Sequence, residues 1–180
     1  MMTKLFWIRV TVIAAFVLHG AHAFAQPKSL GVSFSYTGIS ISYEMYSNRP
    51  DSFIDIVLKS ENSEFYSGRF RHPGISASTS FNYYLKAWTY DETNSVKLFA
   101  GPGLTIGYCP DYKTVEGIMF GLKGKLGVEC TFERDVQITA SIAPIVGSHI
   151  VLDERSAEMK YYRNGFQYGF IPEIGIKYRF

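Results

Sequence analysis

The last sixteen residues of the chain alternate between apolar and polar or small side chains without a break. One face carries aromatic and aliphatic residues up to Phe180, and the other carries Glu173, Gly175 and Lys177. A period of two residues is that of an extended strand, so the pattern predicts one strand from Gly165 to Phe180. At about 3.3 Å per residue this strand is roughly 50 Å long, more than most soluble sheets require. We therefore expect a membrane strand that closes a barrel.

Seven further segments alternate in the same way, and no segment of helical period competes with them. They are Leu30–Tyr36, Ile39–Met45, Phe53–Lys59, Ile75–Ala87, Val96–Tyr108, Ile118–Phe132 and Val136–Val146. The phase slips at Thr37-Gly38, which is either a hairpin turn or a glycine bulge within one long strand. The connections alternate between short polar turns and mostly longer loops, as in outer-membrane barrels. An even strand count places both chain ends on the short-turn rim.

The polar face of these strands indicates which side is inside. Serine, threonine and charged residues on it are interrupted by glycines at positions 101, 103, 107, 121, 127, 147, 169 and 175. Small residues and paired charges suit a crowded lumen, whereas a soluble exterior gives no reason for so many strand glycines. Aromatic residues near both ends of the strands resemble membrane girdles. The sequence predicts an all-β fold, an eight-stranded antiparallel up-and-down transmembrane β-barrel. The alternative is a soluble secreted lipocalin-like barrel.

The amino-terminal segment has the features of a secretory signal peptide. A short basic start precedes the apolar run Val10–Leu18, and Ala23-Phe24-Ala25 is a small-x-small cleavage site. The apolar run is too short for a transmembrane anchor, which is the competing interpretation. We expect residues 1–25 to be removed and residues 26–180 to form one barrel domain. The expected location is the outer membrane, reached through the periplasm.

Charge and composition exclude several classes of partner. Removing Lys4 and Arg9 from 18 basic residues leaves 16, which equals the 16 acidic residues. A neutral chain offers no basic excess for nucleic acid. No clustered histidine or cysteine spacing indicates a metal site, and we expect no cofactor.

The predicted strands keep the members of two pairs of reactive residues from contacting each other. Cys109 lies at the loop rim and Cys130 near the other rim, too far apart for a disulfide, so two free thiols are expected. Ser148 and His149 are neighbours on one strand and point to opposite faces, which excludes a direct catalytic pair. A pair between His149 and a serine on a neighbouring strand stays open.

The terminal strand ends in a polar-x-Gly-x-x-aromatic-x-aromatic pattern, matched by Glu173, Gly175, Tyr178 and Phe180. With this pattern and its eight alternating segments, the mature chain resembles the small eight-stranded outer-membrane proteins of Gram-negative bacteria. Examples are the membrane domain of outer-membrane protein A and outer-membrane protein X. The resemblance implies that the barrel assembly machinery reads the terminal pattern as an insertion signal. The chain lacks the peptidoglycan-binding domain of outer-membrane protein A, so a cell-wall tether is not implied.

Charged residues on the lumen face must pair, because an isolated buried charge is costly. Three acids and four bases fall in the half nearer the short turns: Glu44, Asp55, Lys86, Lys97, Glu129, Lys177 and Arg179. We expect them to form a hydrogen-bonded ionic plug, and hence no open channel. The alternative places several of them in water at the rim.

The outer loops hold the remaining functional candidates. Aromatic and arginine side chains, common at binding surfaces, occur at Arg69, Phe70, Arg71, Tyr161, Tyr162 and Arg163. The cations equally suit pairing with lipopolysaccharide phosphates. We expect a monomeric, non-enzymatic barrel with a structural or surface-interaction role, in contact with outer-membrane lipid and lipopolysaccharide and an unidentified extracellular ligand. A lipid A-modifying enzyme and a narrow solute pore are the alternatives.

Overall fold

The computed structural model describes residues 27–47, 51–61, 74–91, 93–111, 116–133, 135–153 and 156–180. The expected signal peptide lies outside these residues. The described elements are β1 (Lys28–Ser35), β2 (Gly38–Tyr46), β3 (Ser52–Glu61), β4 (Gly74–Thr89), β5 (Ser95–Pro110), β6 (Glu116–Phe132), β7 (Val136–Ile142), β8 (Ile145–Asp153), β9 (Ser156–Tyr161), α2 (Arg163–Gly169) and β10 (Glu173–Arg179). All strand pairs are antiparallel.

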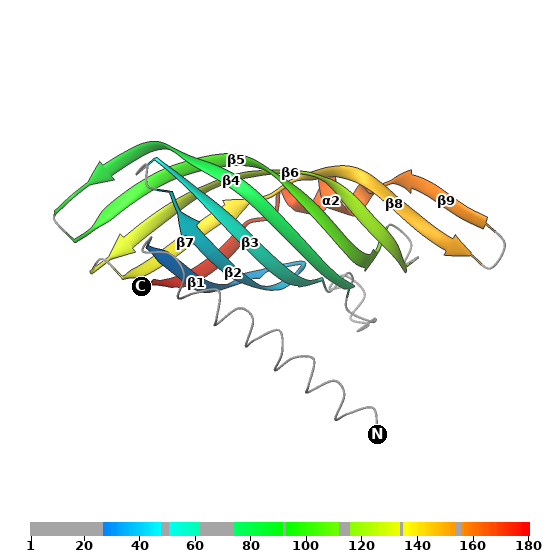
Figure 1. Ribbon diagram of the computed structural model, residues 1–180, viewed down its shortest axis with the longest axis horizontal. Coiled ribbons are helices and arrows are strands. Elements are labelled where there is room, and N and C mark those ends of the chain that lie inside the picture. Colours follow the sequence, from blue (N-terminus) through cyan, green and yellow to red (C-terminus); the bar gives the residue numbers. More distant parts are fainter. Residues whose placement is uncertain are drawn as a thin grey trace, which may run out of the picture.

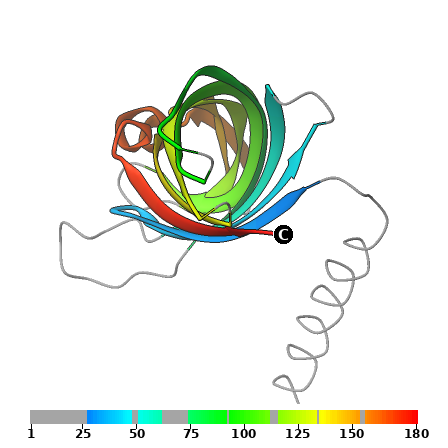
Figure 2. The same cartoon turned by 90° about the vertical axis from the view of Figure 1, so that its left-hand side faces the viewer.

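Eight of the strands close into a barrel. Strands β1 to β7 pair in chain order, and β10 joins β7 to β1, which gives the closed ring in Figure 2. The paired residues can be followed from strand to strand around the ring, starting at Val32. The path through β2, β3, β4 and β5 reaches β6 at Phe120, and the path through β10 and β7 reaches it at Cys130. The two positions are ten residues apart, which is the stagger of the barrel. Such a stagger tilts the strands of a closed barrel by roughly 35–45°. The predicted eight-stranded antiparallel barrel is confirmed.

The barrel is apolar outside and polar inside. The outward residues Leu104 and Ile176 are 59% and 55% exposed, whereas Glu44, Asp55 and Glu129 in the lumen are completely buried. This polarity is the inverse of that of a soluble protein and is typical of a transmembrane barrel, because lipid surrounds the apolar face. The predicted inside and outside faces are therefore confirmed. No helix in the described ranges is long and apolar enough to cross a membrane.

The barrel has two distinct ends. Pro27 and Phe180 lie together beside the turns between β2 and β3, β4 and β5, and β6 and β7, which we call the short-turn end. At the other end, the loop end, lie the β1–β2 turn, the tip of the β8–β9 hairpin and α2. In Figure 1 the β8–β9 hairpin extends past the ends of β5 and β6.

The phase slip near Gly38 is a hairpin turn. Ser35 pairs with Gly38, so β1 and β2 are joined by the turn residues Tyr36 and Thr37. Gly38 has φ of 154°, and a Cβ atom on it would lie 1.9 Å from the carbonyl oxygen of Ser60. Only glycine fits this close approach between β2 and β3.

The predicted strand Gly165–Phe180 is wrong over its first half. Residues 163–169 form α2, and β10 begins only at Glu173. On one side β1 turns back at Tyr36, two residues after Phe34, which pairs with Ile174. On the other side the partner strand is interrupted. A longer β10 would therefore expose unpaired backbone groups, whereas a helix satisfies them internally.

The predicted seventh strand, Val136–Val146, is two strands in the structure. It is interrupted at Ala143-Pro144, and β7 and β8 each pair with a different part of β6. Proline has no N–H to donate to a sheet ladder, which explains the interruption. Between the predicted strands Val136–Val146 and Gly165–Phe180 the structure has the additional strand β9, which pairs with β8 and forms the edge of the sheet.

Candidate functional site

Four aromatic side chains fill the lumen in its short-turn half. We call Tyr46, Phe53, Tyr84 and Phe99 the aromatic plug. Phe53 lies at its centre, with ring centroids 5.8 Å from Tyr46, 5.2 Å from Tyr84 and 5.4 Å from Phe99. Phe53 and Phe99 have no exposed surface. An eight-stranded barrel is just wide enough for side chains to fill, so this cluster closes it.

The predicted ionic plug did not include these aromatic residues. Alternation could have found two of them, because Phe53 shares its face of β3 with Asp55, and Phe99 shares its face of β5 with Lys97. The alternation of each strand, rather than the type of residue, therefore indicated that these two side chains lie in the lumen.

Beside the aromatic plug, the structure brings together Glu44 of β2 and Lys177 of β10 as a buried ion pair. The Glu44 carboxylate also accepts hydrogen bonds from Ser29 Oγ at 2.8 Å and Tyr46 Oη at 3.0 Å. Both charges are thus compensated away from water.

Glu129 of β6 lies in the same region. It accepts hydrogen bonds from Tyr84 Oη at 3.1 Å and from Gln137 Nε2 at 3.3 Å. Lys97 Nζ lies 4.6 Å from the centre of the Tyr84 ring, so this cation faces both an aromatic surface and the neighbouring Glu129. Arg179 rests in the same way on an aromatic face, that of Tyr46, at 4.7 Å.

Asp55 belongs to a separate ion pair nearer the middle of the barrel. Its partner is Lys125 of β6, and both side chains are buried. The adjacent lumen lysine, Lys123, donates to Ser78 Oγ at 2.8 Å. The predicted set lacked both lysines, although their strand face placed them in the lumen.

Lys86 does not join the lumen charges. The β4–β5 register shifts between Tyr84 and Lys86, so a β-bulge reverses the alternation at this point. Lys86 consequently faces outward beside Trp88, with Nζ 5.0 Å from the indole centre. The prediction for this residue was wrong because one inserted residue flips every side chain after it.

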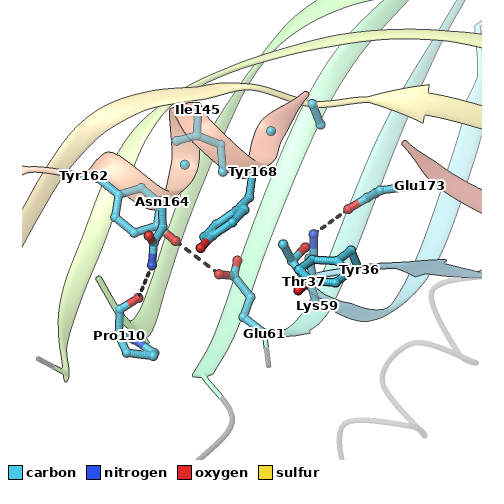
Figure 3. A pocket seen from close by; sticks show the side chains of 13 residues that line it. Tyr36, Thr37, Lys59, Glu61, Pro110, Ile145, Tyr162, Asn164, Tyr168 and Glu173 are labelled. Atoms are coloured by element: carbon cyan, nitrogen blue, oxygen red, sulfur yellow. Dashed lines mark hydrogen bonds and ion pairs between the residues drawn. The ribbon is translucent and has the colours of Figure 1, made fainter. Parts of the chain in front are cut away.

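Toward the loop end, Figure 3 shows a small cavity beside α2. Lys59 of β3 forms an ion pair with Glu173 of β10 at 2.5 Å, and both line this cavity with Glu61. Glu61 Oε1 accepts a hydrogen bond from Ser76 Oγ at 2.8 Å. The cavity volume is about 50 Å³. Ligand pockets typically measure about 300–1,000 Å³, so in this conformation the cavity has room for water only.

Tyr162 was predicted as a surface contact, and the structure buries it. The side chain is 2% exposed and points into the lumen, where its hydroxyl donates to Glu61 Oε2 at 3.2 Å. Cys109 Sγ lies 3.4 Å from the same hydroxyl, and the His149 ring stacks on Tyr162 with centroids 6.0 Å apart. A tyrosine satisfies a buried site only when its hydroxyl finds partners, as it does here.

Of the other predicted loop contacts, two lie within the described residues and three do not. Tyr161 is half-exposed at the end of β9, and Arg163 begins α2. Arg69, Phe70 and Arg71 lie outside the described residues.

Asp111, at the end of β5, anchors the start of α2. Its carboxylate accepts the backbone N–H of Arg163 at 3.3 Å and that of Asn164 at 3.0 Å. Asn164 Nδ2 donates to the Pro110 carbonyl at 3.2 Å. The helix is thus capped from another hairpin, because its own preceding residue provides no side-chain cap.

The predicted insertion signal lies on β10 and just after it. Glu173 points into the lumen, and a Cβ atom on Gly175 would lie 2.9 Å from Ser33 Cβ. Tyr178 and Phe180 are exposed on the outer face. Recognition of this pattern by the assembly machinery stays a prediction.

Ser148 and His149 take opposite faces of β8, as expected. Ser148 pairs with the outward Phe120, whereas His149 is buried with Nε2 2.8 Å from the Cys109 carbonyl oxygen. Cys109 and Cys130 are free thiols. Within the described ranges, no group of three or more histidine, cysteine or acidic side chains could hold a metal ion.

No protein-family model and no curated protein matches this chain. Solved structures that are similar to it include the following three. The N-terminal β-barrel domain of Pseudomonas aeruginosa OprF is 11% identical, with 86% of this chain and 96% of that chain covered and a TM-score of 0.46. A major outer membrane protein from Thermus thermophilus is 11% identical, with 87% and 100% covered and a TM-score of 0.47. Ail, the attachment invasion locus protein of Yersinia pestis, solved with the heparin analogue sucrose octasulfate, is 12% identical, with 86% and 94% covered and a TM-score of 0.35.

Proposed function

We propose that the protein is a non-conducting outer-membrane barrel that has a structural role and presents an interaction surface at its loop end. The aromatic plug carries this proposal, because Phe53 and Phe99 occupy the lumen where a channel would run. Buried ion pairs beside the plug join β2 to β10 and β3 to β6. A barrel filled in this way is rigid and has no water-filled path.

The outer wall supports residence in a membrane. Its large apolar side chains are exposed around the ring, which in water would be an aggregation hazard and in lipid is the favourable state. Export and outer-membrane location follow from the signal peptide and insertion signal, both of which are proposals. Outer-membrane lipid and lipopolysaccharide are then the immediate partners.

The β8–β9 hairpin is the candidate interaction surface. Met159 and Tyr161 on β9 are 66% and 50% exposed, and Lys160 forms an exposed ion pair with Glu158 at 2.9 Å. As an edge strand, β9 also has backbone groups free of a second partner strand. Exposed aromatic, methionine and charged side chains together suit a polypeptide partner.

Membrane residence is tested by fractionation of cells and by gel mobility of boiled and unboiled samples. We expect the protein in outer membranes with a heat-dependent mobility shift, and less folded protein for Phe180→Ala, which removes the terminal aromatic of the signal. A soluble periplasmic protein without a shift would contradict the proposal.

Channel activity is tested in planar bilayers. The wild type should give no conductance steps. The triple variant Phe53→Ala/Phe99→Ala/Tyr162→Ala should conduct, because it removes the two completely buried rings of the plug and the ring that enters the lumen at the loop end. Leu85→Ala is the matched control, since Leu85 is 60% exposed on the outer wall of β4. Steady conductance of the wild type would instead support the narrow pore.

A further inference from the structure

A second closure lies at the loop end, separate from the aromatic plug. The Tyr162 ring enters the lumen between Glu61 of β3, Cys109 of β5 and His149 of β8. α2 follows directly and covers the cavity lined by Lys59 and Glu61 (Figure 3). We propose that α2 and Tyr162 form a lid over a blind chamber in the outer half of the lumen, which takes up a small polar solute when the lid opens.

The helix is weak on its own. It has seven residues, including Gly165 and Gly169, and isolated helices of this length are not stable in water. It has no acidic residue in its first turn and no basic residue in its last, so the anion that faces its N-terminus is supplied from outside the helix, by Asp111. Glycine within a helix costs further stability relative to alanine. The helix therefore depends on what it is docked against.

Its docking contacts include several polar bonds to other elements. Among them are the two bonds to Asp111, the Asn164 bond to the Pro110 carbonyl, and backbone bonds from Tyr162 N–H to the Gly147 carbonyl and from Ala143 N–H to the Gly169 carbonyl. These bonds all come from other elements of the barrel. A short segment that depends on such tertiary bonds opens locally while the rest of a protein stays folded.

The chamber under the lid has the chemistry of a binding site. Lys59, Glu61 and Glu173 line it, and Ser76 bonds to Glu61 from the adjacent strand. A cation and two carboxylates offer donors and acceptors to a polar solute. Below them, the Asp55–Lys125 pair and the aromatic plug close the lumen. A solute that enters from the loop end therefore has no exit at the other end, and the chamber binds rather than conducts. This inference goes beyond the proposed structural role.

Cys109 is a natural reporter of lid opening. Its thiol is completely buried beneath Tyr162, whereas Cys130 is half-buried near the opposite end. The test measures the labelling rate of each thiol by iodoacetamide, itself a small polar solute, in outer-membrane vesicles that contain the full barrel. Asp111→Ala removes both bonds to the helix start and should speed labelling of Cys109 by about fivefold or more, with Cys130 unchanged.

Asp91→Ala is the matched control. Asp91 Oδ1 accepts the backbone N–H groups of Thr93 and Asn94 in a turn at the short-turn end, so its loss removes the same kind of bond far from the lid. This variant should label Cys109 at the wild-type rate. Equal Cys109 rates in wild type, Asp111→Ala and Asp91→Ala, with the heat-dependent mobility shift retained, would overturn the lid.

A second measurement needs no variant. Amide hydrogen exchange of the wild type should show α2 exchanging by a local opening, well before β10. Exchange of both segments at one rate would mean that α2 is a fixed part of the wall. Should Asp111→Ala fail to insert, Asn164→Ala weakens the same docking and gives the labelling test again.

Discussion

Replacing Lys177 by methionine tests whether the lumen charges form a buried ionic plug or are solvated by water at the rim. Lys177 is the ion-pair partner of Glu44, whose side chain has no exposed surface. After Lys177→Met, Glu44 keeps its hydrogen bonds from Ser29 and Tyr46 but loses the only cation bonded to it among the described residues. Leaving a buried charge unpaired typically costs about 3–5 kcal/mol.

The double variant Glu44→Gln/Lys177→Met is the control for the loss of this ion pair. It removes both charges and keeps an acceptor for the Ser29 and Tyr46 hydroxyls. Replacement of both members of a buried pair is often nearly neutral, so we expect stability within about 1 kcal/mol of the wild type. The double variant should thus be more stable than Lys177→Met alone by at least about 2 kcal/mol.

The assay is urea unfolding of the barrel in lipid vesicles, followed by Trp88 fluorescence and by gel mobility. Trp88 lies on the outer wall near the short-turn end, so it reports release from lipid. Agreement between the two probes justifies a two-state free energy. A loss below about 1 kcal/mol for Lys177→Met would refute the reasoning, because that is the range of solvent-exposed ion pairs.

Three other predictions concern single positions. Gly38→Ala should destabilise the barrel by about 2 kcal/mol or more, because its Cβ would strike a strand carbonyl, whereas Gly124→Ala, where the nearest atom is 3.9 Å away, should change urea unfolding little. Hydrogen bonds from Asn94 and Thr93 lower the pKa of Asp91 to about 2, so the carboxylate should titrate there in NMR spectra, and Asn94→Ala should raise that pKa toward its ordinary value. The stabilisation linked to Asp91 is therefore present above its ordinary pKa and lost as pH falls through about 2. Lys86→Met should leave unfolding within about 0.5 kcal/mol of the wild type, because the bulge puts this lysine outside.

The faces of the strands could be predicted because lipid and lumen demand opposite chemistry. In β10, Ile174 and Ile176 face outward and Gly175 and Lys177 face inward, as their alternation predicts. One face of each strand must be apolar along the whole membrane-spanning length, so the pattern is strong even without related sequences. The same logic gave the inward faces of β2 and β6.

The sequence could not predict features that depend on how one strand pairs with or packs against another. The bulge before Lys86 adds one residue to β4 relative to β5, and nothing in the local sequence marks it. Tyr162 illustrates the same limit, because its burial depends on Glu61, Cys109 and His149 from three other strands. Such positions are determined by the register of the closed ring rather than by their own segment.

The helix α2 shows why alternation is necessary for a strand and not sufficient. Phe166 and Phe170 are four residues apart, a spacing that puts both on one face of a strand and also on one face of a helix. Their rings meet edge to face at 5.3 Å, and both are half-exposed on the outer surface. The same side chains therefore face lipid in either conformation, and hydropathy alone does not discriminate. The partner strands decide: β1 turns back and Pro144 interrupts the other neighbour, so the segment without a ladder forms its hydrogen bonds within itself.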